Sequence, residues 1–293
     1  MASSETTGLG LKPSLAAEPS HNVAKPSRRK RRGSTFWRVR EEIPRSLELP
    51  LIGVSLALPL ILWSAIYYSG TVSPFALPSP VGTGEAAYNM LSSGILVADA
   101  WDSVRRVAIG FGLSLAIAVP LGLAMGTFRS IRALFEPAIS LIRYAPATAF
   151  TLLVIIWFGI GEQPKVALVL IGTVFFNTLM TANVVWQVPS ELIKVSQTLG
   201  AGSLTVFRKV IFPYAVPGII DTARINLAAA WNLIVVAELI AADSGLGVRI
   251  VRAQKFLNTD QIFVAIIVIG LLGLLTDIVL RTLRNRLAPW SQE

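Results

Sequence analysis

Long apolar stretches alternate with short polar connections along most of this chain. Six stretches each carry about 20 largely apolar residues, the number that a helix needs to cross about 30 Å of hydrocarbon. The runs are continuous and do not alternate with period two, which favours helices over a membrane barrel. The pattern predicts an all-α integral membrane protein, with a membrane domain at 48–287 between tails 1–47 and 288–293. The expected spans are about 50–70, 104–127, 134–160, 165–187, 215–241 and 261–282.

Composition agrees with a membrane protein. Hydrophobic residues make up 53% of the chain and charged residues 15%, whereas soluble domains carry about 25% charged residues. The net charge is +9, but many Lys and Arg residues sit in the N-terminal tail or at the ends of apolar runs, so the charge sets topology and does not indicate a nucleic-acid partner. The chain has no Cys, and its single His, His21, lies in the polar tail. Thiol chemistry and a His-based catalytic or metal site are therefore not expected.

The distribution of Lys and Arg predicts the orientation of the spans. Residues 1–47 are rich in Ser, Pro and charge, and include the basic run 28–32, so we expect a disordered cytoplasmic tail. The basic run acts as a positive-inside anchor or binds anionic lipid or nucleic acid. Residues 70–103 contain no Lys or Arg and should lie outside, with an interfacial helix at 83–98. Six crossings then place both termini in the cytoplasm.

Two groups of basic residues depart from this rule. One group lies at the outer end of the second span and the other between the fifth and sixth spans. Either these side chains snorkel to the surface, or they form a positive outer vestibule that attracts anions. The residues are Arg105, Arg106, Arg249, Arg252 and Lys255.

The polar segment 189–213, between the fourth and fifth spans, is longer than a simple turn requires. Leu192, Val195 and Leu199 recur at helical spacing and should form one apolar face. Gly200 should end that helix, and a second short helix should follow until Pro213 and Pro217 break it. We expect the apolar face to lie in a groove of a soluble partner; the alternative is that it packs against the protein's own spans.

Several motifs carry a resemblance to a known family. Leu199-Gly-Ala201 and Phe212-Pro213 resemble the cytoplasmic loop of binding-protein-dependent ABC transporter permeases, with 194–196 (Lys-Val-Ser) where that family has Glu-Ala-Ala. The missing glutamate removes one possible salt bridge to an ATPase. Three further motifs resemble the nitrate/sulfonate/taurine subgroup of this family. These motifs are Leu77–Pro80, Trp157–Glu162, and Val236–Ile240 followed by Ser244–Gly247. The resemblance as a whole covers about residues 50–285.

The resemblance implies a six-helix permease of a type I ABC importer. Its partners would be two ATP-binding subunits, a second permease copy (most often identical) and a periplasmic binding protein that delivers a small anion such as a sulfonate, taurine, nitrate or bicarbonate. The chain has no G-x-x-x-x-G-K-[ST] loop, so it should not be an enzyme itself, should need no cofactor or metal, and should leave ATP to another chain. The expected ATPase-docking residues are Lys194, Val195, Ser196, Leu199, Gly200, Ala201, Phe207 and Pro213.

Polar residues within the spans are costly, so they usually pair or line a path. Glu238 should pair with an Arg or accept backbone hydrogen bonds, or else act as a gate. Asp277 and Arg281 should pair on one helix face. A rival function is an ion-coupled carrier using Glu238 or Asp277; an intramembrane enzyme is disfavoured because HExxH and paired acids are missing. The candidate path residues are Arg143, Asn177, Trp231, Asn232 and Glu238.

Overall fold

The computed structural model describes residues 43–241 and 243–291. By its contacts the chain divides into Met1–Ala57 and Leu58–Glu293, and all packing reported below lies within the second unit. The expected disordered tail lies outside the described residues as far as residue 42. Its last three residues, 45–47, belong to the first helix.

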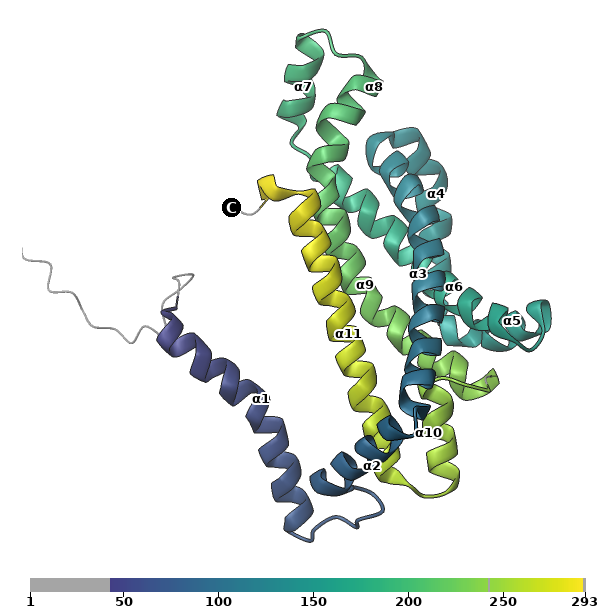
Figure 1. Cartoon of the computed structure of the whole chain (residues 1–293). Helices are drawn as coiled ribbons and strands as arrows, with labels where there is room; N and C mark the ends of the chain where they lie inside the picture. The colour runs from purple at the N-terminus through teal and green to yellow at the C-terminus, as the bar shows by residue number, and fades with distance from the viewer. Residues whose placement is uncertain (1–42, 242, 292–293) are drawn as a thin grey trace, which may run out of the picture. The chain divides into compact units, whose positions relative to one another are not determined.

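Every regular element among the described residues is helical (Figure 1). An all-α fold is therefore confirmed. Short 3₁₀ turns occupy Ala147–Phe150 and Pro289–Ser291, and a π-helical turn occupies Phe207–Ile211. The α-helices are α1 (Arg45–Tyr68), α2 (Pro80–Ser92), α3 (Ile95–Thr127), α4 (Arg129–Ile142), α5 (Thr151–Phe158), α6 (Glu162–Trp186), α7 (Ser190–Thr198), α8 (Ser203–Val206), α9 (Phe212–Ala241), α10 (Leu246–Lys255) and α11 (Thr259–Leu287).

Five helical segments in the described part of the chain are long and apolar enough to cross a membrane, or six if one bent pair counts as a span. The second span is longer than expected, because α3 begins at Ile95 rather than near 104. An outer helix is present before it, but it covers 80–92 and not 83–98. Gly94, at φ +75°, separates the two helices in a left-handed conformation that favours glycine.

The expected third span, 134–160, is not a continuous helix. It consists of α4 and the 3₁₀–α5 segment, which meet at an angle of 80°. The break covers residues 143–146 and ends at Pro146, which lacks an N–H group and disfavours helical geometry in the residue before it. Neither arm is long enough to cross a bilayer alone.

The two ends of the bundle differ (Figure 1). The loop that joins α7 to α8, the α3–α4 junction and the end of α11 lie at one end, here the α7–α8 end. Helices α2 and α10 lie at the opposite end, here the α2–α10 end. Segments that the positive-inside rule assigns to one side of the membrane therefore gather at one end of the structure.

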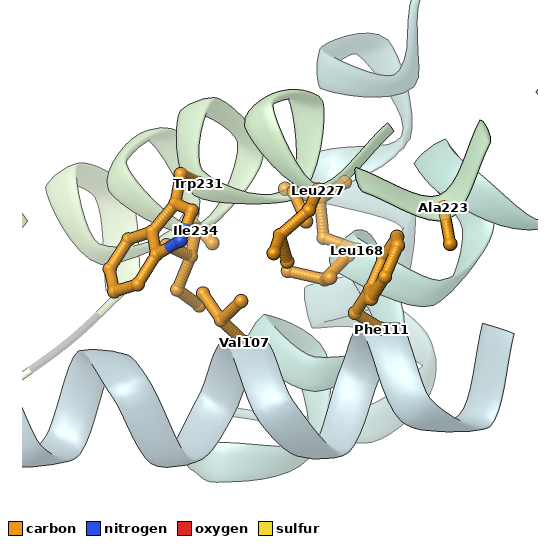
Figure 2. Close-up of a cluster of buried hydrophobic side chains, with 10 residues drawn as sticks. Val107, Phe111, Leu168, Ala223, Leu227, Trp231 and Ile234 are labelled. Carbon is orange, nitrogen blue, oxygen red and sulfur yellow. The ribbon is translucent and has the colours of Figure 1, made fainter. Parts of the chain in front are cut away.

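The core is formed by α3, α6 and α9, which pack on one another. Figure 2 shows Val107 and Phe111 of α3 facing Leu227 and Trp231 of α9, with Leu168 of α6 between them. All of these side chains are buried. The association of these three helices places the polar groups described below in protein and not in lipid.

Small residues let α3 approach α6 closely. A Cβ atom added to Gly122 would lie 2.6 Å from the Cβ of Thr181, and one added to Gly126 would lie 2.4 Å from the Cβ of Val185. These two glycines form a G-x-x-x-G pattern, which allows close helix contact in membranes. The sequence analysis missed this pattern.

We expect Gly122→Ala to destabilise the protein by about 1–3 kcal/mol, because the methyl group has no room against α6. The measurement is the thermal unfolding midpoint of the purified protein in detergent. Gly112→Ala is the matched control on the same helix, since a Cβ at Gly112 meets nothing within 4 Å. Equal midpoints for the two variants would contradict the close contact.

Candidate functional site

The α7–α8 loop turns back on itself at Gly200. The Gly200 N–H donates to the carbonyl of Gln197 at 2.9 Å, and the Ala201 N–H donates to that of Ser196 at 3.0 Å. This pair of bonds is a Schellman motif, which requires a left-handed residue after the helix. Gly200 has φ +85° and fills that position. The expectation that this glycine ends the helix is confirmed.

The loop has two apolar faces with different environments. Val195, Leu199 and Leu204 are exposed, and Leu199 keeps 83% of its surface accessible. On the inner face, Val206 and Ile193 pack into a cluster with residues of α3, α6 and α9. The inner face therefore packs on the spans, and the outer face has no covering within the described chain. Docking of a partner at the outer face stays a prediction.

The expected docking residues do not all lie at this tip. Lys194 and Val195 are exposed on α7, with Ser196 half-buried beside them. Phe207 instead packs toward the core beside Phe212, with ring centroids 6.4 Å apart. Pro213 lies in the first turn of α9.

The prolines do not break the fifth span. Helical structure runs without interruption from Ser203 to Ile240. A π-helical turn precedes Pro213, and the N–H of Phe212 donates to the carbonyl of Phe207, five residues earlier. The wider π turn lets the helix continue through Pro213, although proline lacks the N–H group that an α-helical hydrogen bond needs. Membrane helices tolerate proline when such local π geometry gives the freed backbone groups other partners. Pro217 lies within α9.

Three of the five candidate path residues are enclosed in the protein. Asn177 accepts a hydrogen bond from Asn226 at 2.7 Å and donates one to Ser114 at 3.0 Å, which joins α3, α6 and α9. The indole N–H of Trp231 donates to Thr276 of α11 at 3.2 Å. Glu238 is also buried. In this conformation these three side chains hold helices together.

The other two candidates are more accessible. Asn232 is exposed on α9 and donates to the carbonyl of Ala228 one turn earlier. Arg143 lies in the α4–α5 break, where its guanidinium stacks 4.9 Å from the ring centre of Tyr144. Its Nε atom is buried and has no hydrogen-bond partner among the described residues. Arg143 therefore has one donor that no described residue satisfies.

A buried ionic centre joins the spans at the α2–α10 end. We call it the Arg106 cluster; its members are Ser103, Arg106, Glu162, Glu238 and Ser244. The Arg106 side chain is 1% exposed and makes five hydrogen bonds, one for each N–H that a guanidinium carries. Two go to Glu162 at 2.7 Å, one to Glu238 at 2.6 Å and two to Ser244.

Glu238 accepts further hydrogen bonds, which stabilise its buried carboxylate. The Ser103 hydroxyl donates to it at 2.8 Å and the backbone N–H of Gly247 at 2.9 Å. A Cβ at Gly245 would lie 2.4 Å from Glu238 Oε1, and one at Gly247 would lie 2.7 Å from Glu238 Cβ. The two glycines of the Ser-Gly-Leu-Gly motif therefore let the backbone approach this carboxylate. The expectation that Glu238 pairs with an Arg and accepts a backbone hydrogen bond is confirmed.

Comparisons with known proteins show the family to which the chain belongs. The family described as "Binding-protein-dependent transport system inner membrane component" matches residues 118–289. The chain is 34% identical over 256 residues to the taurine transport system permease protein TauC of Escherichia coli, covering 85% of this chain and 93% of that one. It is 32% identical to a putative aliphatic sulfonates transport permease protein of Bacillus subtilis, covering 80% and 85%. The chain belongs to this family of ABC transporter permeases.

Relatives named as taurine, sulfonate and nitrate permeases place the permease in that subgroup. A solved structure titled as an inward-facing MetNI methionine ABC transporter superimposes with a TM-score of 0.52 and 22% identity, covering 65% of this chain and 97% of the other. That similarity confirms the type I permease fold. The protein is thus an integral, multi-pass membrane permease, a family of transport proteins and not of enzymes.

Two of the three subgroup motifs of the permease converge in space. Glu162, the last residue of the motif Trp157–Glu162, accepts hydrogen bonds from Arg106. The motif that contains Glu238 and Ser244 supplies the other acceptors of Arg106. From the sequence we identified the motifs and Arg106, but neither Ser103 nor the role of Arg106 in joining the motifs. One signal in the sequence could have predicted this pair: an Arg in one apolar span and a Glu in another, each costly in lipid without a partner. Arg106 neither snorkels nor faces a vestibule, which corrects both expectations for this residue.

Two other ion pairs in the permease also differ from expectation. Asp277 bonds to Arg224 of α9 at 2.9 Å and not to Arg281 of its own helix, so the pair joins two spans. Arg249 of α10 bonds to Asp99 of α3 at 2.7 Å. Pairs between helices satisfy charge and fix the packing at once, which a pair on one helix surface does not.

We expect Glu238→Gln to lower the stability of the permease by about 3–5 kcal/mol, because it removes one of the two carboxylates that balance the buried Arg106 charge and puts an amide donor where Ser103 and Gly247 need an acceptor. Glu136→Gln is the control: Glu136 pairs with Arg132 four residues earlier on α4 and is partly exposed. Its loss should cost only about 0.3–0.5 kcal/mol. The measurement is thermal unfolding in detergent, and a wild-type midpoint for Glu238→Gln would refute the structural role of the cluster.

Proposed function

We propose that the protein is the membrane permease subunit of an ATP-driven importer that carries a small anion, such as a sulfonate, taurine, nitrate or bicarbonate, across a bacterial inner membrane. A periplasmic binding protein delivers the solute and two ATP-binding subunits drive its passage. The observation that carries the proposal is the exposed apolar tip around Leu199, on a loop held in shape by Gly200. The names of the relatives support the class of solute.

The α7–α8 end faces the cytoplasm in this proposal, with both chain termini on the same side. Arg129, Lys194 and Arg208 lie in segments at this end, as the positive-inside rule requires. The ATP-binding subunits then meet Lys194, Val195, Ser196, Leu199, Gly200 and Ala201 on the loop. ATP binds those subunits, and this chain needs no cofactor of its own.

A second copy of the chain completes the path. One face of α9 is exposed and consists mostly of small or apolar residues, with Asn232 among them; a polar amide is costly when it faces lipid. Small residues favour close helix approach, so this face is suited to a partner helix. The exposed residues are Ile225, Ala228, Ala229, Asn232 and Leu239. Arg143, Asn177, Trp231, Asn232 and Glu238 remain the proposed path residues, with the enclosed three reached only if the helices part.

A single helical segment connects the docking loop to the Arg106 cluster. Ser203–Ile240 contains 38 residues, a contour of about 57 Å at 1.5 Å per residue. It begins next to the loop and carries Glu238 near its other end. Closure of the ATP-binding subunits would move the loop, and the segment would carry that movement to the outer ends of the spans.

An ion-coupled carrier is the rival function, and two contacts argue against it. It would need Glu238 or Asp277 free to exchange a proton or a cation. Each of these carboxylates is bonded to an arginine, Arg106 or Arg224. Exchange of a proton or a cation at either carboxylate would first have to break a contact between two spans.

Gly200→Val tests the docking loop, because a β-branched residue is strained at φ +85°. We expect the variant to insert normally but to lose the co-purifying ATPase or transport-coupled ATP hydrolysis. Solute uptake should fall about tenfold or more, because about 1–2 kcal/mol of backbone strain distorts a loop that must fit a partner. Gly202→Val is the control, since Gly202 has an extended conformation and open space around its Cα atom. Wild-type uptake by Gly200→Val, or proton-driven uptake by the purified chain alone, would overturn the proposal.

Arg143→Ala tests the proposed anion contact. We expect weaker uptake through a raised KM with unchanged assembly, because the free donor at the α4–α5 break is removed. Arg286→Ala, an exposed Arg in the last turn of α11, is the control for the loss of one positive charge. Solute uptake in reconstituted vesicles measures both. A KM equal to wild type would remove Arg143 from the path.

A further inference from the structure

A groove of 710 Å³ lies at the α7–α8 end, between the end of α3 and the start of the α8–α9 segment. Pro120, Leu123, Ala124 and Phe128 form the wall on the α3 side. The opposite wall is formed by Ser203, Leu204, Phe207, Arg208 and Phe212. Phe207 and the motif residue Phe212 contribute to it, as does Leu204 of the α7–α8 loop, but none of the five path residues does.

The walls are apolar and belong largely to membrane spans. Pro120 and Leu123 lie within the span Ile95–Thr127, and Phe212 lies within Ser203–Ile240. Phe128, Leu204 and Phe212 are exposed in the described chain, so the groove is unfilled apolar surface and not part of the closed core. The groove lies at the ends of two helices that are long and apolar enough to cross a membrane, and its apolar walls continue the surface of those helices.

The charges near the groove are positive. Arg208 lines it and makes no hydrogen bond or ion pair with another described residue, while no acidic residue is among its lining residues. Arg129 follows Phe128 directly, and its guanidinium lies 5.6 Å from the ring centre of Trp186. Trp is enriched at the membrane interface, and basic pockets between spans on the cytoplasmic side suit anionic headgroups.

We propose that this groove binds an anionic phospholipid, with one acyl chain between the two walls and Arg208 against the phosphate. The position of the walls within the spans favours lipid over a soluble protein, which would meet the loop at Leu199. Assignment to the cytoplasmic leaflet rests on the orientation proposed above, but lipid binding itself does not. Such a lipid would brace the start of the α8–α9 segment next to the docking loop.

The test measures lipid retained by the purified full-length chain in detergent, by native mass spectrometry after addition of phosphatidylglycerol or phosphatidylcholine. We expect tighter binding of phosphatidylglycerol, and a loss of about fivefold or more in Arg208→Glu, since one basic residue near an anionic headgroup is worth about that factor. Lys209→Glu is the matched control: the adjacent residue is exposed, basic and not part of the groove. Equal losses in the two variants, or none in Arg208→Glu, would overturn the proposal.

A second variant tests the acyl-chain wall. Ser203→Trp should fill the groove and reduce binding of both lipids, while Arg208→Glu reduces mainly that of phosphatidylglycerol. Unchanged lipid binding in Ser203→Trp, together with loss of a co-purifying ATPase subunit, would make the groove a protein contact and refute the lipid site. Because the assay needs neither ATP nor solute, its failure is distinguishable from failure of the proposed transport function.

Discussion

The arrangement of the spans at the α2–α10 end depends on one buried guanidinium. Arg106 has five N–H donors, and acceptors from α6, from α9 and from the turn after α9 satisfy all of them. A charge at that depth is tolerated only when it is paired and fully hydrogen-bonded, so each acceptor must be brought to it by a correctly packed helix. The cluster therefore depends on the correct relative positions of α3, α6 and α9 and on the turn that leads into α10.

The opposite end follows a different principle. There the Schellman turn at Gly200 fixes the backbone, but the outer apolar side chains and the groove beside Arg208 have no cover within the described chain. One end of the permease is thus held together by polar contacts, and the other has apolar side chains that no described residue covers. The continuous helix Ser203–Ile240 joins the two ends, so a force applied at one is carried to the other through hydrogen-bonded backbone.

The prolines show why rules for soluble helices need care in a membrane protein. Pro146 coincides with a bend of 80°, whereas Pro213 follows a π-helical turn and leaves the helix continuous. The same missing N–H has two outcomes, because the outcome depends on which neighbouring groups can accept or replace the lost hydrogen bond. Those neighbours are tertiary and cannot be read from the proline itself.

Apolar run lengths and the placement of Lys and Arg were enough to predict an all-α membrane protein with six apolar segments, and the motifs were enough to name the family. Hydrocarbon thickness and the cost of unpaired backbone make those properties local to each segment. The partners of Glu238 and Asp277, the contact of Gly122 with α6 and the bend after α4 were decided only by the tertiary structure. Each depends on which side chains from distant segments meet inside the bundle, and a pairing across more than 50 residues leaves no periodic trace in the sequence.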